Sequence, residues 1–325
     1  MMGVMRAVAY TRYGSPDVLR LVDLPVPEPR PGEVLVRVHA VSLNASDWEY
    51  LRGRPAYARV AGLFRPRRPV LGSDIAGTVE STGADVTGFA PGDAVFADIL
   101  SYLGGFAEYV RVPAKVLAPM PAGMSFVEAA ALPQAGAVAL DGIRNKGQAR
   151  AGQRVLINGA GGGSGSYAIQ LAKLVGAEVT GVDNAEKLDF MRSLGADHVL
   201  DYREADYTAR GETYDLILDL AAYRSAAAYA RALAPGGRFL YVGGSLRTLA
   251  RVLVGGPLVG RAGAKKVGLL VVRLGVQHIA PMVELCRTGQ VRTVIDRRFP
   301  LNEVPEALRY LGTGHAKGKV VVTVA

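Results

Sequence analysis

The chain opens with short runs in which apolar and polar residues partly alternate, the pattern of half-buried strands. Three of these runs are Val34–Val41, Asp74–Ser81 and Asp93–Ala97. Prolines and glycines separate the runs, as in the turn Arg30–Glu33 that precedes the first of them. Many short strands joined by such turns predict a partly open β-barrel or a sandwich.

Beyond Ser125 the pattern changes to helices that alternate with almost continuously apolar strands. Ser125 and Glu128 have the spacing of a capping box at the start of a helix expected over Phe126–Lys146. Further strands and helices are expected in turn at Arg154–Asn158, Ser164–Val175, Glu178–Asp183, Ala185–Leu194, His198–Leu200, Asp215–Asp219, Ser225–Leu233, Arg238–Val242 and Val267–Val272. This alternation predicts a parallel sheet that is covered by helices on both faces.

The last stretch, Arg297–Ala325, returns to β character. A β-rich beginning and end around an α/β middle predict a discontinuous domain with a second domain inserted into it. We expect residues 1–122 and 291–325 to form the first domain and residues 123–290 the second. Residues 245–266 are apolar, basic and punctuated by glycine, which predicts a mobile helical lobe near a cleft. A helix that touches a membrane is the alternative for that segment.

Composition and charge narrow the class of protein. Half of the 325 residues are apolar and 21% are charged, which is typical of a globular protein with a sizeable core. The formal net charge is +9, but the cations are scattered and no nucleic-acid-binding motif accompanies them, so we expect no nucleic acid partner. The apolar stretches are too short to cross a bilayer and no signal peptide is visible. We therefore expect a cytoplasmic protein without a membrane partner.

The residue types that hold metals or act as nucleophiles are scarce. The single cysteine, Cys286, excludes an intramolecular disulfide and a thiolate zinc cluster. No pair of the four histidines has helical spacing, and no Ser/His/Asp motif is recognisable. We expect no metal site, so the chemistry must come mainly from an organic cofactor.

A glycine-rich segment between a strand and a helix carries the strongest functional signal. Its residues Ala160, Gly162 and Gly165 follow a variant of the G-x-G-x-x-G motif. Glycines let backbone N–H groups approach a pyrophosphate, and the helix N-terminus adds partial positive charge. The expected cofactor-binding residues here are Ala160, Gly162, Gly163, Ser164 and Gly165. A glycine-rich loop that binds no ligand is the alternative.

An acidic residue, Asp183, ends the next strand at the spacing of a dinucleotide-binding fingerprint. Its carboxylate would accept hydrogen bonds from ribose hydroxyls and would favour NADH over NADPH, and it could also cap a helix. Lys187, Arg203 and Tyr202 are the residues that could meet a 2′-phosphate instead. Ligands in doubly wound sheets lie beyond the strand ends, so three further candidates are Gly243, Gly244 and Ser245.

Several motifs in a fixed order resemble one family. They are Ser42–Asp47, Val70–Val79, Gly104–Tyr109, the glycine-rich segment, Leu194–Val199 and Gly314–Val321. Together they resemble the zinc-independent quinone oxidoreductase branch of the medium-chain dehydrogenase/reductase superfamily, over nearly the whole chain. Zinc-dependent relatives carry a cysteine near Asn44 and a His-Glu pair near Ser73 and Asp74, which this sequence lacks.

The resemblance implies a GroES-like, partly open β-barrel domain plus a Rossmann domain with a doubly wound parallel sheet. It also implies a homodimer joined through edge strands of the Rossmann sheets, for which Val267–Val272 is the candidate. The family usually reduces quinones or enones with NADPH, and Lys187 and Tyr202 match positions that contact the 2′-phosphate. The sequence departs from that pattern at Asp183–Glu186, so NADH stays open as the cofactor.

Direct hydride transfer to an electrophilic carbon would need residues that orient the acceptor and supply a proton. By resemblance Asn44 lies by the nicotinamide or the substrate, although asparagine often serves only in a turn. Tyr57 is a candidate proton donor, followed by Tyr50, and both could instead be packing aromatics. Gln134 is expected to touch the ribose or the amide of the nicotinamide.

Three functions remain open from the sequence. The first is an NAD(P)H-dependent reductase of a small quinone or an α,β-unsaturated carbonyl compound. The second is an enoyl-thioester reductase, because the basic segment Arg247–Lys266 could attract an anionic carrier. The third is a non-catalytic NAD(P)H-binding sensor or partner protein. Turnover with different acceptors distinguishes them, because the fold alone does not determine the function.

Overall fold

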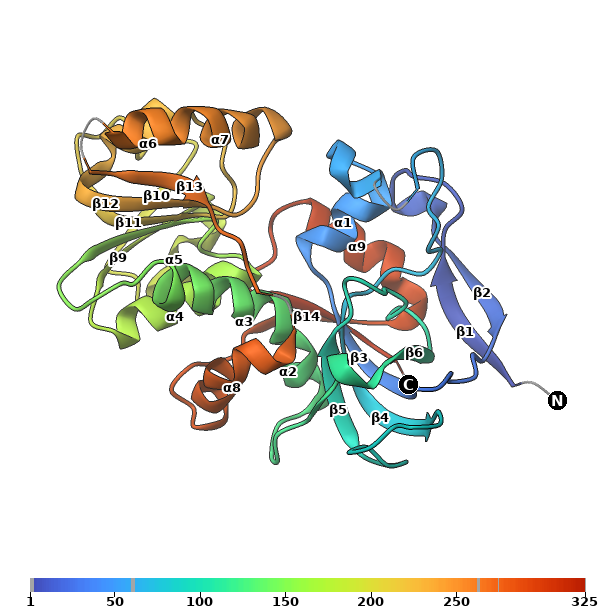
Figure 1. Ribbon diagram of the computed structural model, residues 1–325. Coiled ribbons are helices and arrows are strands. Elements are labelled where there is room, and N and C mark those ends of the chain that lie inside the picture. Colours follow the sequence, from blue (N-terminus) through green and yellow to red (C-terminus); the bar gives the residue numbers. More distant parts are fainter. Residues whose placement is uncertain (1–2, 60–61, 262–263, 274, 325) are drawn as a thin grey trace. The chain divides into compact units, whose positions relative to one another are not determined.

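The computed structural model of the protein describes residues 3–59, 62–261, 264–273 and 275–324. The chain divides into two compact units (Figure 1). The first comprises Met1–Gln134, Leu274–Arg287 and Ile295–Ala325, and the second comprises Ala135–Arg273 and Thr288–Val294. The sequence places the domain boundaries at other residues, after 122 and 290, and those boundaries stay predictions.

The first unit is built on a largely antiparallel sheet, which over the described residues has the order β14–β15–β3–β4–β5–β7, with β6 also paired to β3. Its strands, with the separate hairpin β1–β2, are β1 (Val4–Ala9), β2 (Arg20–Pro25), β3 (Glu33–Ser42), β4 (Asp74–Thr82), β5 (Ala94–Asp98), β6 (Tyr109–Pro113), β7 (Ala118–Pro119), β14 (Ile295–Pro300) and β15 (Lys319–Thr323). The strands expected at Val34–Val41, Asp74–Ser81 and Asp93–Ala97 are confirmed with small shifts at their ends. Valines of β3 and β15 lie in the hydrophobic core of this unit.

Helices pack on this sheet and on one another. They are α1 (Ala45–Arg52), α2 (Phe126–Ala131), α8 (Ala280–Arg287) and α9 (Val304–Gly312). Helix α2 lies against β3 and β4, and α9 contacts both α1 and β15. The β character expected of the last stretch is present in β14 and β15, and α9, which was not predicted, lies between them. Its apolar residues Val304, Ala307 and Leu308 have helical spacing and are buried.

The second unit contains a parallel sheet, with the order β10–β9–β8–β11–β12–β13 in the described ranges. Its elements are β8 (Arg154–Asn158), α4 (Gly163–Leu174), β9 (Glu178–Asp183), α5 (Leu188–Ser193), β10 (His198–Asp201), β11 (Tyr214–Asp219), α6 (Ala226–Arg231), β12 (Leu233–Tyr241), α7 (Leu246–Arg261) and β13 (Lys266–Leu269). Helices α4 and α5 cover one face of the sheet, and α6 and α7 cover the other (Figure 1). The doubly wound fold predicted from the sequence is confirmed, because every pairing in this sheet is parallel.

One expected helix is broken. The segment Phe126–Lys146 forms α2, then α3 (Pro133–Leu140) and a wide turn over Asp141–Asn145. Pro133 ends the first part, because proline lacks the N–H that would continue the helix and its ring clashes with the preceding turn. The capping box is confirmed, since Ser125 N donates to Glu128 Oε2 at 3.0 Å and Glu128 N donates to Ser125 Oγ at 3.3 Å.

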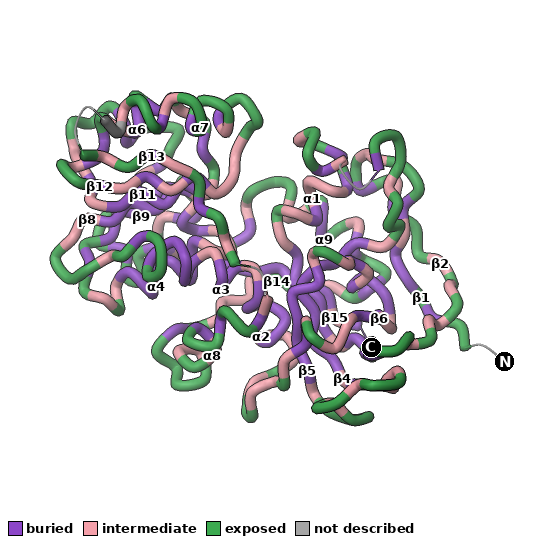
Figure 2. The backbone as a smooth tube through the Cα atoms, viewed as in Figure 1, coloured by how far each residue is buried: buried purple, intermediate pink, exposed green. Residues whose placement is uncertain are grey.

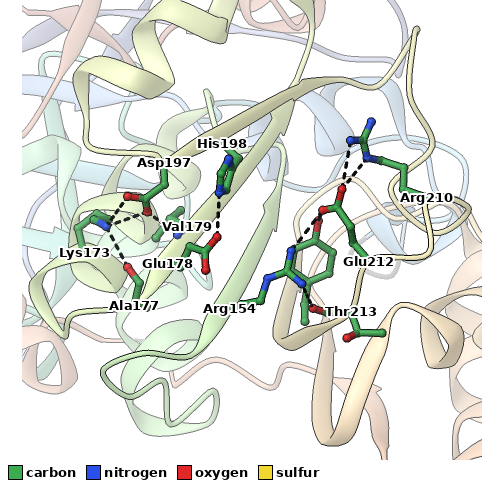
Figure 3. A network of polar contacts seen from close by, with 11 residues as sticks. Arg154, Lys173, Ala177, Glu178, Val179, Asp197, His198, Arg210, Glu212 and Thr213 are labelled. Carbon is green, nitrogen blue, oxygen red and sulfur yellow. Dashed lines mark hydrogen bonds and ion pairs between the residues drawn. The ribbon is translucent and has the colours of Figure 1, made fainter.

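Ion pairs connect the amino ends of the parallel strands (Figure 3). Arg154 and Arg210 both contact Glu212, at 3.3 and 3.1 Å, while His198 Nε2 lies 2.8 Å from Glu178. Lys173 pairs with Asp197 at 2.8 Å. Each basic group drawn in Figure 3 therefore has a carboxylate partner, and the network ties strand ends together. The interiors of the central strands β8, β9 and β11 are buried (Figure 2).

Candidate functional site

The glycine-rich loop joins β8 to α4 in the second unit. Gly159 has a φ of +81°, in the left-handed region that glycine adopts at no cost. Gly162 is the N-cap of α4, and Gly163, Ser164 and Gly165 form its first turn. A Cβ atom on Gly165 would overlap the carbonyl oxygens of Gly159 and Ala160. The loop therefore closes against the helix start only if position 165 is glycine.

Asp183, at the end of β9, holds this loop. Its Oδ2 accepts a hydrogen bond from Gly161 N at 3.0 Å, and its Oδ1 accepts one from Asn184 N at 2.9 Å. Lys187 Nζ lies 3.3 Å from Oδ1, and both side chains are buried. Asp183 does not cap the turn Ala185–Lys187, which begins after Asn184. Both oxygens of this carboxylate are used within the protein, and its expected bond to a ribose stays a prediction.

Asn184 is a site residue that the sequence reading missed. Its side chain is buried, with 5% exposed, and Oδ1 has no hydrogen-bond partner among the described residues. A buried acceptor without a donor is costly, and a hydroxyl or amine of a bound ligand would satisfy it. The signal in the sequence that could have identified Asn184 is its position directly after Asp183, the acidic residue of the dinucleotide-binding fingerprint. With the glycine loop and the helix N-terminus, this atom fits a dinucleotide bound at the end of the sheet.

The remaining candidates of the second unit follow the ends of β10 and β12. Tyr202 is 42% exposed, and the Arg203 guanidinium lies 5.7 Å from its ring centre. Gly243 accepts a hydrogen bond from Ala222 N at 2.8 Å, and a Cβ on Gly244 would overlap the Ala222 carbonyl oxygen. Ser245 Oγ accepts from Thr248 N at 3.1 Å and so caps α7. These contacts give Gly243, Gly244 and Ser245 a structural role, and their contact with a cofactor stays a prediction.

A second group of polar side chains surrounds Asn44 in the first unit. We call it the Asn44 cluster, and its members are Asn44, Asp47, Ser73, Asp74, Asp98, Gln134 and Lys319. Asn44 precedes α1, and its amide is held from both sides. Nδ2 donates to Asp74 Oδ2 at 2.9 Å, while Oδ1 accepts from Lys319 Nζ at 2.6 Å. Because one neighbour accepts and the other donates, the amide has a single orientation.

Gln134 joins two carboxylates of this cluster. Its Nε2 lies 3.2 Å from Asp74 Oδ1 and 3.4 Å from Asp98 Oδ1. Its backbone N donates to Asp74 Oδ2 at 3.1 Å, and its Oε1 accepts from Ser46 Oγ at 3.1 Å. The amide of Gln134 is therefore engaged within the first unit. The expected contact between Gln134 and a nicotinamide stays a prediction.

Burial shifts the protonation of the cluster. Burial first, and then the charge of Asp98, raise the pKa of Asp74 to about 8. Burial raises the pKa of Asp47 to about 6, against hydrogen bonds from the backbone of Asn44 and Gly72. Burial also lowers the pKa of the Lys319 ammonium, and the charges of Asp74 and Asp47 oppose this shift. Burial and the neighbouring carboxylate thus favour the protonated form of Asp74.

The chain is similar in sequence and in fold to several known proteins. Residues 30–122 match the family described as alcohol dehydrogenase GroES-like domain, and residues 194–322 match zinc-binding dehydrogenase. A chloroplast quinone oxidoreductase from Triphysaria versicolor is 36% identical, over 98% of this chain and 98% of the relative. The NADPH-dependent alkenal/one oxidoreductase of Arabidopsis thaliana is 32% identical, over 98% of this chain and 79% of the relative. The solved quinone oxidoreductase of Coxiella burnetii has a TM-score of 0.88 and 31% identity, over 99% of this chain and 100% of that one.

The chain belongs to the zinc-independent quinone oxidoreductase branch of the medium-chain dehydrogenase/reductase superfamily. The GroES-like and Rossmann folds expected from the resemblance are thereby confirmed. Within the described ranges, no group of three or more His, Cys, Asp and Glu side chains is arranged to hold a metal ion. In the same part of the chain, no helix is long and apolar enough to cross a membrane.

In this quinone oxidoreductase relative, the two candidate tyrosines lie in different surroundings. Tyr57, in the turn Ala56–Arg59, is 45% exposed and donates to Glu49 Oε2 at 2.7 Å. Tyr50, on α1, is half-buried, and burial raises its pKa. It lines a cavity of about 140 Å³ together with Tyr10 and Tyr13. Whether either hydroxyl donates a proton stays a prediction.

The pH dependence of stability tests the buried proton of Asp74. Its folded-state pKa of about 8 lies above the ordinary value of 3.8. The unfolded chain therefore loses this proton near pH 4, while the folded protein keeps it until about pH 8. The free energy of unfolding should fall across that range, by up to about 5 kcal/mol from this group. In Asp74→Asn the fall should be smaller, as urea unfolding at pH 4.5, 6 and 8 would measure. An unchanged slope would contradict the buried proton.

Proposed function

We propose that the protein transfers a hydride from NAD(P)H to a small quinone or an α,β-unsaturated carbonyl compound, without a metal ion. The observation that carries this proposal is the glycine loop closed on α4, with the orphaned Asn184 Oδ1 beside it. The names of the relatives, a quinone oxidoreductase and an alkenal/one oxidoreductase, support the acceptor class.

The nicotinamide ring, when bound, supplies the hydride. The protein must bind the cofactor, orient the acceptor and provide for the uptake of a proton. We infer that the first turn of α4, with Ala160, Gly162, Gly163, Ser164 and Gly165, binds the diphosphate through backbone N–H groups. Gln134 and the turn Gly243–Ser245 remain our candidates for contact with the rest of the cofactor. Asn44, fixed between Lys319 and Asp74, is the residue proposed to orient the acceptor.

Hydride addition leaves negative charge on the acceptor oxygen, which then takes up a proton. We propose Tyr57 as its donor, with Tyr50 as the second candidate and solvent as the third. Tyr57, whose hydroxyl donates to Glu49 Oε2 at 2.7 Å, would regain its proton from solvent. The acceptor thus gains one hydride and one proton in each turnover.

We propose NADPH as the preferred cofactor, with NADH as the alternative. Lys187 neutralises Asp183, so this carboxylate does not present an unbalanced negative charge to a 2′-phosphate. The exposed Arg203 and Tyr202 lie close in sequence to the end of β10, which pairs with β9 at Asp183. The NADPH dependence stated in the name of the Arabidopsis relative supports the same preference.

Two substitutions should move the cofactor preference in opposite directions. Lys187→Met leaves Asp183 unneutralised, so the ratio of kcat/KM for NADPH to that for NADH should fall at least about tenfold. Asp183→Asn frees Lys187 for a phosphate, and the ratio should rise by a similar factor. Because both cofactors are measured on the same variant, a general loss of activity cancels. Lys173→Met, which removes an ion pair elsewhere on α4, is the control and should leave the ratio unchanged.

The test of the function itself is steady-state oxidation of NADPH and NADH with a simple quinone and a simple enone. Turnover that favours NADPH would support the proposal in full, whereas turnover that favours NADH would make Asp183 the selecting residue. Turnover only with an enoyl thioester would replace the acceptor class. Cofactor binding without turnover on any of these acceptors would sink the reductase proposal and favour a sensor.

We also propose a homodimer in the cytoplasm. Strand β13 is an outer strand of the parallel sheet, and Leu269 at its end and Val271 just after it are 41% and 68% exposed. An exposed apolar edge is normally covered, and pairing with a second copy would cover it. Light scattering should therefore give twice the mass of the chain, and Val271→Lys should shift the mass toward that of a monomer.

A further inference from the structure

The positive charge of the chain is concentrated in one segment of the second unit. No acidic residue lies between Asp219 and Glu284. The same segment carries nine basic residues, which are Arg224, Arg231, Arg238, Arg247, Arg251, Arg261, Lys265, Lys266 and Arg273. The other 29 basic residues of the chain balance its 29 acidic residues, so the whole formal net charge of +9 belongs to this segment. Such a surface attracts anions.

Helix α7, within this segment, presents apolar side chains to solvent. One side packs on β13 and α6, where Thr248 and Val252 are buried. The other side carries Leu253, Val254 and Leu258, which are 54%, 72% and 65% exposed. Figure 2 shows α7 on the surface of the second unit, with long exposed stretches. A surface helix normally turns polar residues to water, so this face is adapted to contact with something apolar.

Two arginines accompany these apolar residues. Arg247 and Arg251 are exposed, and in the described part of the chain neither guanidinium has an ion pair or a hydrogen bond. Both line an open groove of about 740 Å³ between α6 and α7, whose other walls are apolar or small. By contrast, Arg224 pairs with Asp206 and Lys265 donates to Ala230 O. The two free cations thus lie beside the apolar face, with no carboxylate near them in sequence.

We propose that the exposed face of α7 binds the surface of an anionic lipid bilayer. Leu253, Val254 and Leu258 would enter the boundary between headgroups and acyl chains, while Arg247 and Arg251 would meet lipid phosphates. Aliphatic side chains gain nothing against a nucleic acid backbone, so their exposure favours lipid over nucleic acid as the anionic partner. The helix lies on the membrane and does not cross it. This proposal revises the expectation of no membrane partner and is independent of the catalytic proposal.

Vesicle binding of the full chain tests this proposal. The protein should sediment with vesicles of phosphatidylcholine and phosphatidylglycerol, and should stay in solution with phosphatidylcholine alone. Binding should weaken as salt rises, because the attraction between exposed charges is screened. Equal binding to both kinds of vesicle, or binding to neither, would overturn the proposal. The result does not depend on turnover, so it stands or falls separately from the reductase activity.

Matched variants locate the binding face. Arg251→Glu should weaken binding to the anionic vesicles about tenfold or more, and Leu258→Ser should weaken it several-fold. Arg12→Glu changes the net charge equally, and Val4→Ser removes an equally exposed apolar residue, both in the first unit. Both controls should bind as the unchanged protein does. Thermal unfolding confirms that each variant is folded. If the two controls bind the anionic vesicles as weakly as the α7 variants do, the exposed face of α7 is not the binding site.

The same variants also test two other partners for the exposed face of α7, a second copy of the chain and a nucleic acid. If Leu258→Ser lowers the oligomeric mass measured by light scattering, a second copy of the chain covers α7 and the proposal is wrong. Duplex DNA is the other competitor. If DNA displaces the vesicles, and if its affinity for the protein is unchanged by Leu258→Ser but lowered by Arg251→Glu, the surface is a nucleic acid site. A change in vesicle binding without either effect supports the lipid surface.

Discussion

Replacement of Gly165 by alanine should weaken NADPH binding about a hundredfold. The new methyl group would overlap two carbonyl oxygens, those of Gly159 and Ala160, so the loop and the first turn of α4 must separate. The backbone N–H groups of that turn would then no longer point at the phosphates. Losing two hydrogen bonds to a charged group costs about 3 kcal/mol, which is a factor of about a hundred in the dissociation constant.

The measurement is a fluorescence titration with NADPH, and the control is Gly268→Ala on β13. A Cβ atom at Gly268 meets nothing within 4 Å, so this variant should bind NADPH normally. Alanine also favours a helix over glycine by about 1 kcal/mol, so Gly165→Ala need not unfold the protein. An unchanged dissociation constant for Gly165→Ala would show that the start of α4 does not bind the phosphates.

The glycine loop could be predicted because its signal is local. The strand Arg154–Asn158, the glycines and the following helix occupy consecutive positions, and each element confirms the others. The role of Asp183 was harder to see. Its spacing is that of a ribose-binding residue, but its oxygens bind Gly161, Asn184 and Lys187. The sequence places an acidic residue by the loop and does not tell which donors occupy its two oxygens.

The Asn44 cluster could be predicted only in part, because it joins residues that are far apart in the sequence. Asn44 stands in a recognisable motif, whereas Lys319, its partner, lies 275 positions away. Asp74, which accepts from Asn44, comes from β4, and Gln134, which donates to Asp74, comes from α3. No hydrophobic period or spacing within one segment reports such a contact. Helix α9 was missed for a simpler reason, since its first turn contains Pro305, which suggests a loop unless it is read as a helix start.

Both clusters share one physical feature, a buried charge whose partners come from within its own unit. Lys187 neutralises Asp183 beside the glycine loop, and Lys319 lies between Asn44 and the buried carboxylates Asp47 and Asp74. Breaking such an arrangement by removing one partner is costly, because the remaining charge stays buried and unpaired. The largest loss of stability in the first unit is therefore expected at Lys319.

Lys319→Met should lower the free energy of unfolding by about 3–5 kcal/mol and reduce kcat strongly. Lys319 is 2% exposed, and its ammonium donates to Leu43 O at 3.1 Å as well as to Asn44. Its loss leaves two acceptors without a donor and lets the Asn44 amide rotate. Urea unfolding and steady-state kinetics measure the two effects. Lys317→Met is the control, since Lys317 is exposed two positions earlier, and it should change neither quantity.

A second substitution separates the charge of Lys319 from its packing. If the lysine stabilises the fold by opposing buried carboxylates, then above about pH 8, where Asp74 is ionised, Asp74→Asn should cost less, or even stabilise, once Lys319 is methionine. The difference between the two backgrounds is the coupling energy, and at this proximity we expect at least about 1 kcal/mol. Additive losses would mean that methionine only fails to fill the space of the lysine. The double variant could also regain stability without regaining kcat. In that case the charge balance is repaired while the Asn44 amide still lacks its donor. Lys319 would then have a further role, which is to position Asn44.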